Sequence, residues 1–321
     1  MDLDVLFAGT AASAPTARRG LPATLVRRGG DRLLFDCGEG TQRQLVRSVG
    51  LVEIDEIYLT HFHADHVLGL PGMLKTYGLQ ARERPLRVFG PPGLRRLLAV
   101  LAPVIGRIPF ELESAELEAG AELPRDGYRL ASFEVDHGVP ALGYALIEDE
   151  RPGRFDEERA RALGVAPGPD FGRLQRGEAV NGVEPDQVLG EARRGRKVVL
   201  AGDTAPCDMT RAVAYRADLL VHEATFTEED AERAAATRHS TARSAAELAA
   251  SAQVELLALT HVSARYPASA LRDEARGSFE RTVVPRDFDR IEIPLPERGP
   301  PSHVRAGDGD AVQATAPGQS G

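Results

Sequence analysis

The chain has 321 residues, 42% of them hydrophobic and 27% charged, which is the composition of a globular protein large enough to bury a sizeable core. Its formal net charge of −9 excludes a wholly basic nucleic-acid coat, although binding to nucleic acid depends on local clusters rather than on the sum. Two cysteines cannot form a disulfide scaffold, and neither a membrane-spanning apolar window nor a signal peptide is evident, so we expect a cytoplasmic protein without membrane contact.

The predicted elements alternate between strands and helices. Strands are expected at 2–9, 21–26 and 32–37, and a helix at 40–49. Four more short apolar strands, at 55–60, 198–201, 218–221 and 255–260, each lead into a potential metal ligand or acid–base group: His61, Asp203, His222 with Glu223, and His261. Helices are expected between them, at 67–80, 92–101, 155–163 and 241–251. Functional groups at strand ends are typical of layered α/β proteins.

Two stretches differ in composition from the rest. Residues 148–196 are rich in glycine, proline and charge and indicate an insertion, of which 148–180 is predicted to be a flexible arm. Residues 297–321 have few large apolar side chains and predict a disordered tail. We therefore expect one catalytic domain over residues 1–296, interrupted by the arm.

Seven of the eight histidines lie at or near strand ends or within one short motif, residues 61–66, which reads His-Phe-His-Ala-Asp-His. Three imidazoles and a carboxylate in six residues suit borderline metals such as zinc. His61 and His63 alternate on an extended segment, so both can face one ion. Asp65 and His66 follow a turn and can face a second.

This motif, followed by a lone histidine, an aspartate and a further histidine, resembles the metallo-β-lactamase superfamily. The resemblance implies an α/β fold, the four-layer αββα sandwich, with two zinc ions per subunit, or manganese or iron in their place. Related flavin di-iron proteins carry glutamate where this chain has His63, so histidine there favours zinc hydrolysis over redox chemistry. The implied ligands are His61, His63 and His137 for one ion, Asp65, His66 and His261 for the other, and Asp203 as the bridge.

Further motifs resemble the ribonuclease Z family and occur in that family's order: residues 35–42, 202–204, 222–226, 239–242 and 260–266. Residues 141–177 also resemble it, and in the short bacterial form this region is an arm that grips tRNA. The resemblance implies that Gly168, Pro169, Arg173 and Arg176 contact RNA, although the two arginines could equally solvate a loop. It also implies a homodimer in which the arm of one subunit holds the precursor tRNA cut by the other.

The implied activity is endonucleolytic removal of the 3′ trailer of precursor tRNA, leaving a 3′-hydroxyl on the tRNA and a 5′-phosphate on the trailer. Asp65 would be general base as well as ligand, His239 would stabilise the phosphorane or protonate the leaving oxygen, and Glu223 would orient His239. Strand alternation turns His222 away from Glu223, which indicates that it is either structural or a support behind the metal ligands. Two alternatives stay open: a zinc-dependent phosphodiesterase or other small-ester hydrolase of the same fold, which would not need the arm, and a non-catalytic RNA-binding relative.

One loop departs from the family pattern. Its members often carry Pro-x-Lys-x-Arg-Asn after the first strand, a loop linked to sensing the CCA end. Here Pro15 and Arg19 fit that pattern, whereas Ala17 and Gly20 do not. The cut position and the rejection of CCA-bearing substrates are therefore not predicted by the resemblance.

Overall fold

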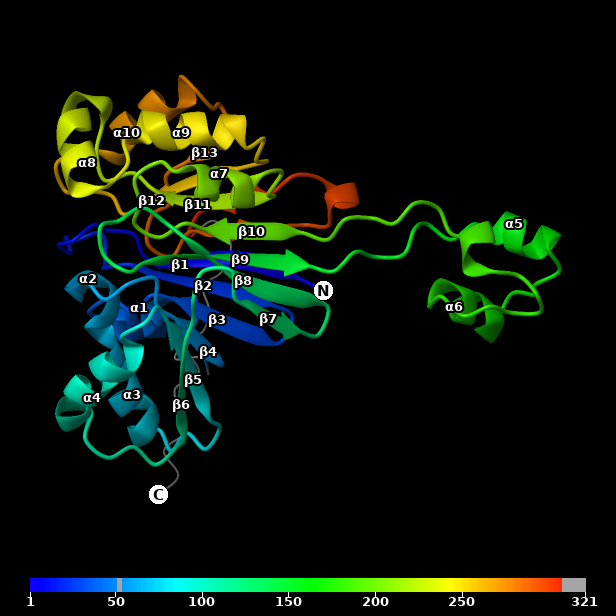
Figure 1. Ribbon diagram of the computed structural model, residues 1–321, viewed down its shortest axis with the longest axis horizontal. Coiled ribbons are helices and arrows are strands. Elements are labelled where there is room, and N and C mark those ends of the chain that lie inside the picture. Colours follow the sequence, from blue (N-terminus) through cyan, green and yellow to red (C-terminus); the bar gives the residue numbers. More distant parts are fainter. Residues whose placement is uncertain (51–53, 308–321) are drawn as a thin grey trace.

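The computed structural model describes residues 1–50 and 54–307 and consists of two mixed β-sheets packed face to face, each covered by helices on its outer side (Figure 1). This arrangement is the predicted four-layer αββα sandwich. Among the described residues, every helix is too short or too polar to cross a membrane.

One sheet has eight strands, in the order β15-β14-β1-β2-β3-β4-β5-β6. Its strands are β1 Leu3–Gly9, β2 Ala23–Arg28, β3 Asp31–Phe35, β4 Glu56–Tyr58, β5 Leu86–Gly90, β6 Leu112–Glu116, β14 Arg290–Glu292 and β15 Ser302–Val304. Its outer face carries α1 Thr41–Ser48, α2 Ala64–Val67, α3 Gly69–Leu79 and α4 Leu94–Ile105.

The other sheet has seven strands, in the order β13-β12-β11-β10-β9-β8-β7. Its strands are β7 Glu122–Arg125, β8 Tyr128–Glu134, β9 Leu142–Glu148, β10 Lys197–Leu200, β11 Leu219–Glu223, β12 Leu257–Thr260 and β13 Thr282–Val283. On its outer side lie η2 Glu228–Asp230, α7 Asp208–Ala214, α8 Ala231–Thr237, α9 Ala242–Ser251 and α10 Ala268–Arg276.

Side-chain alternation explains why the central strands are continuous apolar runs. In β1, Val5 and Phe7 point into the core between the sheets, whereas Leu6 and Ala8 pack under the helices. Because both faces are buried, no polar alternation appears in the sequence. Between the sheets, the ring of Tyr58 stacks on Phe35 and Phe89, with centroids 5.1 and 4.9 Å apart. These three rings lie on neighbouring strands of one sheet, and Tyr144 of the other sheet packs against them: its ring centroid is 5.3 Å from that of Tyr58, and its hydroxyl donates to the carbonyl oxygen of Leu59 at 2.8 Å.

An arm leaves the sandwich between β9 and β10 and projects away from it (Figure 1). It contains α5 Glu157–Ala162, α6 Pro169–Gln175 and η1 Pro185–Gln187. The bridges Arg151↔Arg193 and Phe155↔Leu189 hold its two strands together. Its tip has a small apolar core of its own, formed by Phe155, Ala160, Val165, Phe171, Leu174, Val180, Val183 and Val188. The arm thus extends beyond the predicted 148–180, and its tip is a folded unit whose apolar residues are too widely spaced to form a periodic pattern.

The C-terminal segment differs from the disordered tail predicted over 297–321. The short helix η3 Pro296–Arg298 begins it, and β15 then pairs with β14 in the register Arg290↔Val304. The carboxylate of Asp289 accepts a hydrogen bond from the backbone N–H of Ala306 at 2.9 Å. Edge pairing of this kind uses backbone groups and needs few apolar side chains, which is why composition did not indicate it. The remainder of the predicted tail, 308–321, lies outside the described residues.

Candidate active site

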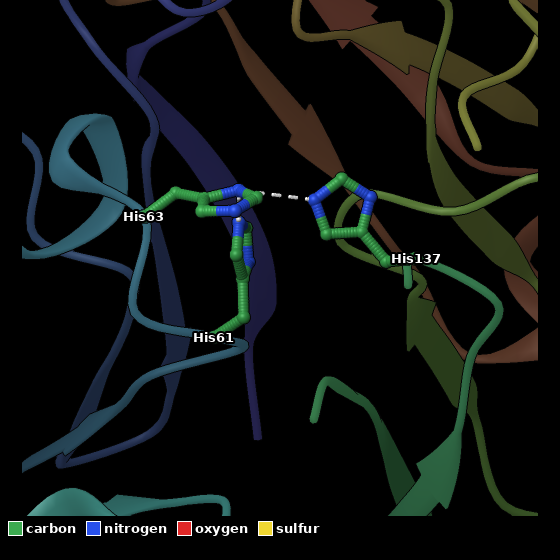
Figure 2. A group of neighbouring side chains, drawn as sticks. All are labelled: His61, His63 and His137. Atoms are coloured by element: carbon green, nitrogen blue, oxygen red, sulfur yellow. Dashed lines mark hydrogen bonds between the residues drawn. The ribbon is translucent and has the colours of Figure 1, made fainter. Parts of the chain in front are cut away.

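Three histidines from both sheets converge on one point. His61 and His63 follow β4, and His137 follows β8. The Nδ1 atom of His63 lies 2.9 Å from Nε2 of His61 and 3.1 Å from Nε2 of His137 (Figure 2). Burial and the neighbouring His66 lower the pKa of His61 to about 2, so its imidazole is neutral and offers a lone pair. Three converging imidazole nitrogens are the ligand set that zinc and related cations prefer.

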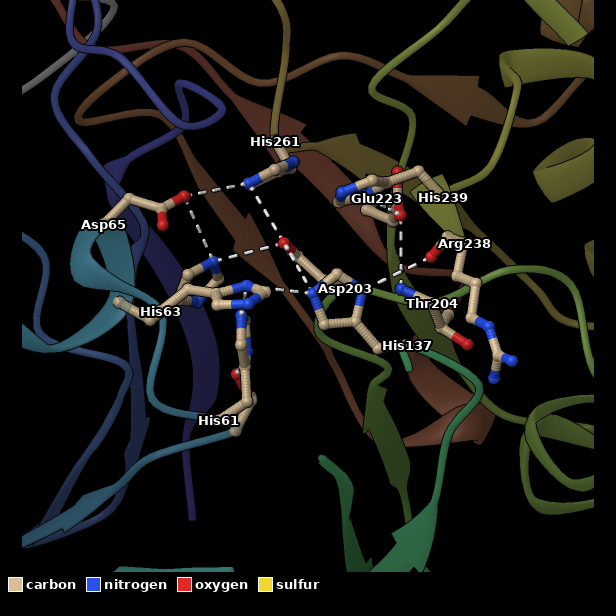
Figure 3. A network of polar contacts seen from close by, with 12 residues as sticks. His61, His63, Asp65, His137, Asp203, Thr204, Glu223, Arg238, His239 and His261 are labelled. Atoms are coloured by element: carbon tan, nitrogen blue, oxygen red, sulfur yellow. Dashed lines mark hydrogen bonds and ion pairs between the residues drawn. The ribbon is translucent and has the colours of Figure 1, made fainter. Parts of the chain in front are cut away.

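A second cluster adjoins the first and adds carboxylates. Asp65 and His66 lie in α2, Asp203 follows β10 and His261 follows β12. Nε2 of His261 lies 3.2 Å from an oxygen of Asp203 and 3.3 Å from an oxygen of Asp65 (Figure 3). Nε2 of His66 lies 3.3 and 3.5 Å from the same two oxygens. Nε2 of His66 is buried and has no hydrogen-bond partner within the described part of the chain. Two nitrogens and two carboxylates at these distances fit a second divalent cation.

Asp203 lies between the two clusters. The same carboxylate oxygen that faces His66 and His261 is 4.0 Å from Nε2 of His137. Burial would raise the pKa of Asp203, but His261 and His66 outweigh it and hold that pKa well below its usual range. An ionised carboxylate in this place fits the predicted bridging role.

Buried side chains behind the clusters fix the ligand rings. A carboxylate oxygen of Asp36 lies 2.8 Å from Nδ1 of His66, and the other accepts the backbone N–H of Thr60 at 2.8 Å. The hydroxyl of Thr60 lies 3.0 Å from Nδ1 of His61, and that of Thr225 lies 2.8 Å from Nδ1 of His261. Each contact occupies Nδ1 and leaves Nε2 to face the cluster. The sequence analysis did not predict that these side chains orient the ligand histidines. For Asp36, the signal that could have indicated it was an acidic residue directly after the apolar strand β3.

His239 and Glu223 lie beside the clusters as a pair. Nδ1 of His239 is 2.6 Å from a carboxylate oxygen of Glu223, which is fully buried at the end of β11. The His239 ring stacks on that of His261, with centroids 5.4 Å apart. Burial would lower the pKa of His239, but the hydrogen bond and charge of Glu223 outweigh it and raise that pKa. His239 also belongs to two further groups of side chains that could hold a metal ion, one with His137 and Asp203 and the other with Glu223 and His261.

Two residues near the site lie outside its chemistry. His222 is fully buried, with Nδ1 2.8 Å from the backbone carbonyl oxygen of Glu223, on the strand face opposite the Glu223 side chain. Cys37 is fully buried, and burial raises the pKa of its thiol to about 12. A thiol with this pKa is not a nucleophile near neutral pH.

The predicted RNA-binding residues lie on the arm, apart from the clusters. Gly168 precedes α6, and Pro169 is its first residue. Arg173 forms ion pairs with Glu178 at 3.0 Å and Asp170 at 3.4 Å, and Arg176 pairs with Glu178 at 3.4 Å. The arm starts where β9 ends and β10 begins (Figure 1), whereas Asp203 follows the other end of β10. The arm and the clusters therefore lie at opposite ends of the sheet.

Comparisons with known proteins agree with this geometry. Residues 20–261 match the family model of the metallo-beta-lactamase superfamily. The ribonuclease Z of Gemmatimonas aurantiaca is 47% identical over 92% of this chain and 98% of its own, and that of Myxococcus xanthus is 46% identical over 91% and 98%. The crystal structure of human tRNase Z, short form, aligns with a TM-score of 0.66 at 26% identity, over 91% of this chain and all of that one.

Proposed function

Because this chain belongs to the ribonuclease Z family of the metallo-beta-lactamase superfamily, we propose that it is a metal-dependent endoribonuclease that removes the 3′ trailer of precursor tRNA. One observation carries the proposal: two ligand clusters share Asp203 in a chain that also carries a folded arm. A hydrolase of small esters would need the clusters but not the arm.

The ligand set divides between two cations. His61, His63 and His137 would hold one, Asp65, His66 and His261 would hold the other, and Asp203 would touch both. We infer zinc, with manganese or iron as chemically acceptable substitutes for this nitrogen and oxygen set. When bound, such ions stabilise charge on the scissile phosphate and supply a nucleophile at neutral pH.

The chain's own residues then move the protons. Burial would raise the pKa of Asp65, but the hydrogen bond of His261 and the charges of His66 and His261 outweigh it and lower that pKa, so this carboxylate is ionised and can accept a proton from the attacking water. As the water oxygen bonds to phosphorus, the bond from phosphorus to the 3′-oxygen breaks. His239, whose Nδ1 faces Glu223, would give the proton on its other nitrogen to that leaving oxygen. The tRNA then ends in a 3′-hydroxyl and the trailer begins with a 5′-phosphate.

We infer that the active form is a homodimer that works in the cytoplasm. The arm leaves the sheet at the end opposite the clusters, so an arm serves a second subunit's cleft more readily than its own. Large apolar side chains on the helices of the first sheet are more than half exposed and offer a surface for subunit contact: Val46, Leu79, Val100 and Val104. In such a dimer, Gly168, Pro169, Arg173 and Arg176 at the arm tip would contact the tRNA body.

Shortening the arm tests the proposal against the small-ester alternative. The bridge Phe155↔Leu189 brings two backbone segments together, so residues 156–188 can be replaced by a short turn without disturbing β9 or β10. The expected result is loss of precursor-tRNA cleavage with retained hydrolysis of a small phosphodiester such as bis(p-nitrophenyl) phosphate. Unchanged tRNA cleavage by the shortened protein would contradict the proposed role of the arm.

A further inference from the structure

A strongly basic hollow of about 470 Å³ lies beside the 10–20 loop, α10 and the C-terminal segment. Among the residues that the structure describes, its lining contains one carboxylate, Asp289, together with six arginines and a histidine: Arg18, Arg19, Arg272, Arg276, Arg286, Arg305 and His303. The chain as a whole carries a net charge of −9, so this concentration of positive charge is local. None of these side chains belongs to the two ligand clusters or to the His239–Glu223 pair.

Asp289, the carboxylate found in the described part of the lining, already has hydrogen-bond partners. Asp289 accepts hydrogen bonds from the backbone N–H groups of Arg286 and Ala306, both at 2.9 Å, and lies 2.9 Å from Nε2 of His303. Most of its acceptor sites are therefore already used, and no hydrogen bond from an arginine side chain to Asp289 occurs among the described residues.

Three of the arginine side chains have no polar partner among the described residues. Within the described residues, the side chains of Arg18, Arg286 and Arg305 are exposed and form no ion pair or hydrogen bond. The other arginines are held: Arg272 pairs with Asp273 at 2.7 Å, Nε of Arg276 donates to the carbonyl oxygen of Thr282, and Arg19 donates to the carbonyl oxygen of Pro285. The hollow thus presents free guanidinium groups to an anionic ligand.

The hollow lies at the same end of the sheets as the metal ligands. The backbone N–H of Val262, directly after His261, donates to the carbonyl oxygen of Thr10 at 2.9 Å, and that of Ala12 donates back to Val262 at 3.1 Å. These bonds fix the base of the 10–20 loop beside His261. A second hollow of about 330 Å³, which includes Arg27, Arg47 and Arg290, shares Arg305 with the first, so the basic surface continues past it.

We propose that this hollow binds the phosphate backbone of the single-stranded 3′ trailer through Arg18, Arg286 and Arg305, an inference that rests on the proposed function. A concave site of this size admits part of a single strand, whereas a duplex presents its backbone to wider surfaces. No phenylalanine, tyrosine or tryptophan of the described chain lines the hollow, so the contacts are to phosphates rather than stacked bases. Trailers of any sequence would therefore be accepted.

The test compares two precursor tRNAs with the same body, one with a long trailer and one with a trailer of a single nucleotide. The double variant R286A/R305A should lower kcat/KM for the long trailer about tenfold, mainly through KM, and for the short trailer by about twofold or less. The slope of log KM against log salt should fall by about 1.4 on the long trailer, since two phosphate contacts are lost. The variant R286K/R305K, which keeps both charges, should recover most of the loss.

The matched control is R107A/R298A. These exposed arginines also form no ion pair or side-chain hydrogen bond among the described residues, and they lie away from the hollow, after α4 and in η3. The control removes the same charge and should cleave both substrates as the wild type does. Equal losses on both trailers, or no loss in R286A/R305A, would overturn the inference while leaving the proposed function intact. Failure of the wild type to cut either substrate would overturn the proposed function itself.

Discussion

Glu148 should be one of the most sensitive positions for stability, because it neutralises two buried guanidinium groups at the root of the arm. Its carboxylate accepts hydrogen bonds from Arg28 Nε at 2.8 Å and from Arg196 Nε and NH2, each at 2.7 Å. Arg196 is only 2% exposed and also donates to the carbonyl oxygens of Ile293 and Met1. The cluster therefore joins β2 and β9 to the residue before β10, to Met1 and to the residue after β14.

The magnitude follows from the pKa of Glu148. Burial would raise that pKa, but the hydrogen bonds and charges of Arg196 and Arg28 outweigh it and lower the value from 4.5 to about 2. Such a depression corresponds to about 3 kcal/mol of folding free energy. Since the folded-state pKa lies below the unfolded one, this stabilisation is complete above pH 4.5 and is lost as the pH falls towards 2.

The substitution Glu148→Gln removes the charge and keeps the shape, and urea unfolding measures the result. At pH 7 the variant should lose about 3 kcal/mol relative to the wild type, and the difference should shrink below pH 4.5. Glu122→Gln is the control: its exposed ion pair with Arg129 spans 3.2 Å, and its loss should cost about 0.5 kcal/mol or less. A loss below about 1 kcal/mol for Glu148→Gln, or one independent of pH, would refute the reasoning.

Three further predictions concern the clusters. The carboxylate of Asp36 orients His66 and accepts the backbone N–H of Thr60. Asp36→Asn should therefore weaken metal affinity about 10- to 100-fold in metal-titration experiments, while the circular dichroism spectrum stays unchanged. Unchanged affinity would contradict that role. His239→Ala should lower kcat about 10²- to 10⁴-fold with the bound metal per chain unaltered, whereas loss of metal would instead make His239 a ligand. Removal of metal by a chelator should abolish cleavage and lower Tm, because the buried carboxylates of Asp65 and Asp203 lose their counter-ions, and added zinc should restore both; a Tm insensitive to the chelator would argue against metal at these clusters.

The sequence predicted the position of the clusters well because their residues follow strand ends. His61 and His261 come directly after predicted strands and Asp203 comes two residues after one, and such apolar runs are recognisable without knowledge of the fold. The strands β6 and β7 were not predicted, since their residues are largely exposed or half-buried and charged. The three-residue strands β14 and β15 are too short to form a pattern.

Contacts between distant segments were beyond sequence reasoning. Nothing in the chain order indicates that Asp36 reaches both His66 and Thr60, because these contacts depend on how β3 and β4 pair. The same holds for the basic hollow, whose arginines come from segments more than two hundred residues apart. Local pattern identifies which residues have suitable chemistry, and only the tertiary structure shows which of them meet.

The central claim is tested most directly by mapping the product ends of a 3′-extended precursor tRNA cut by the zinc-loaded protein, with His63→Ala as the paired variant. The account predicts one metal-dependent cut at or near the discriminator base, with a 3′-hydroxyl on the tRNA and a 5′-phosphate on the trailer, absent in His63→Ala. The same map would show whether Ala17 and Gly20 shift the cut position. No cleavage of the precursor, with a small phosphodiester still hydrolysed, would contradict the account and assign the clusters to small-ester hydrolysis.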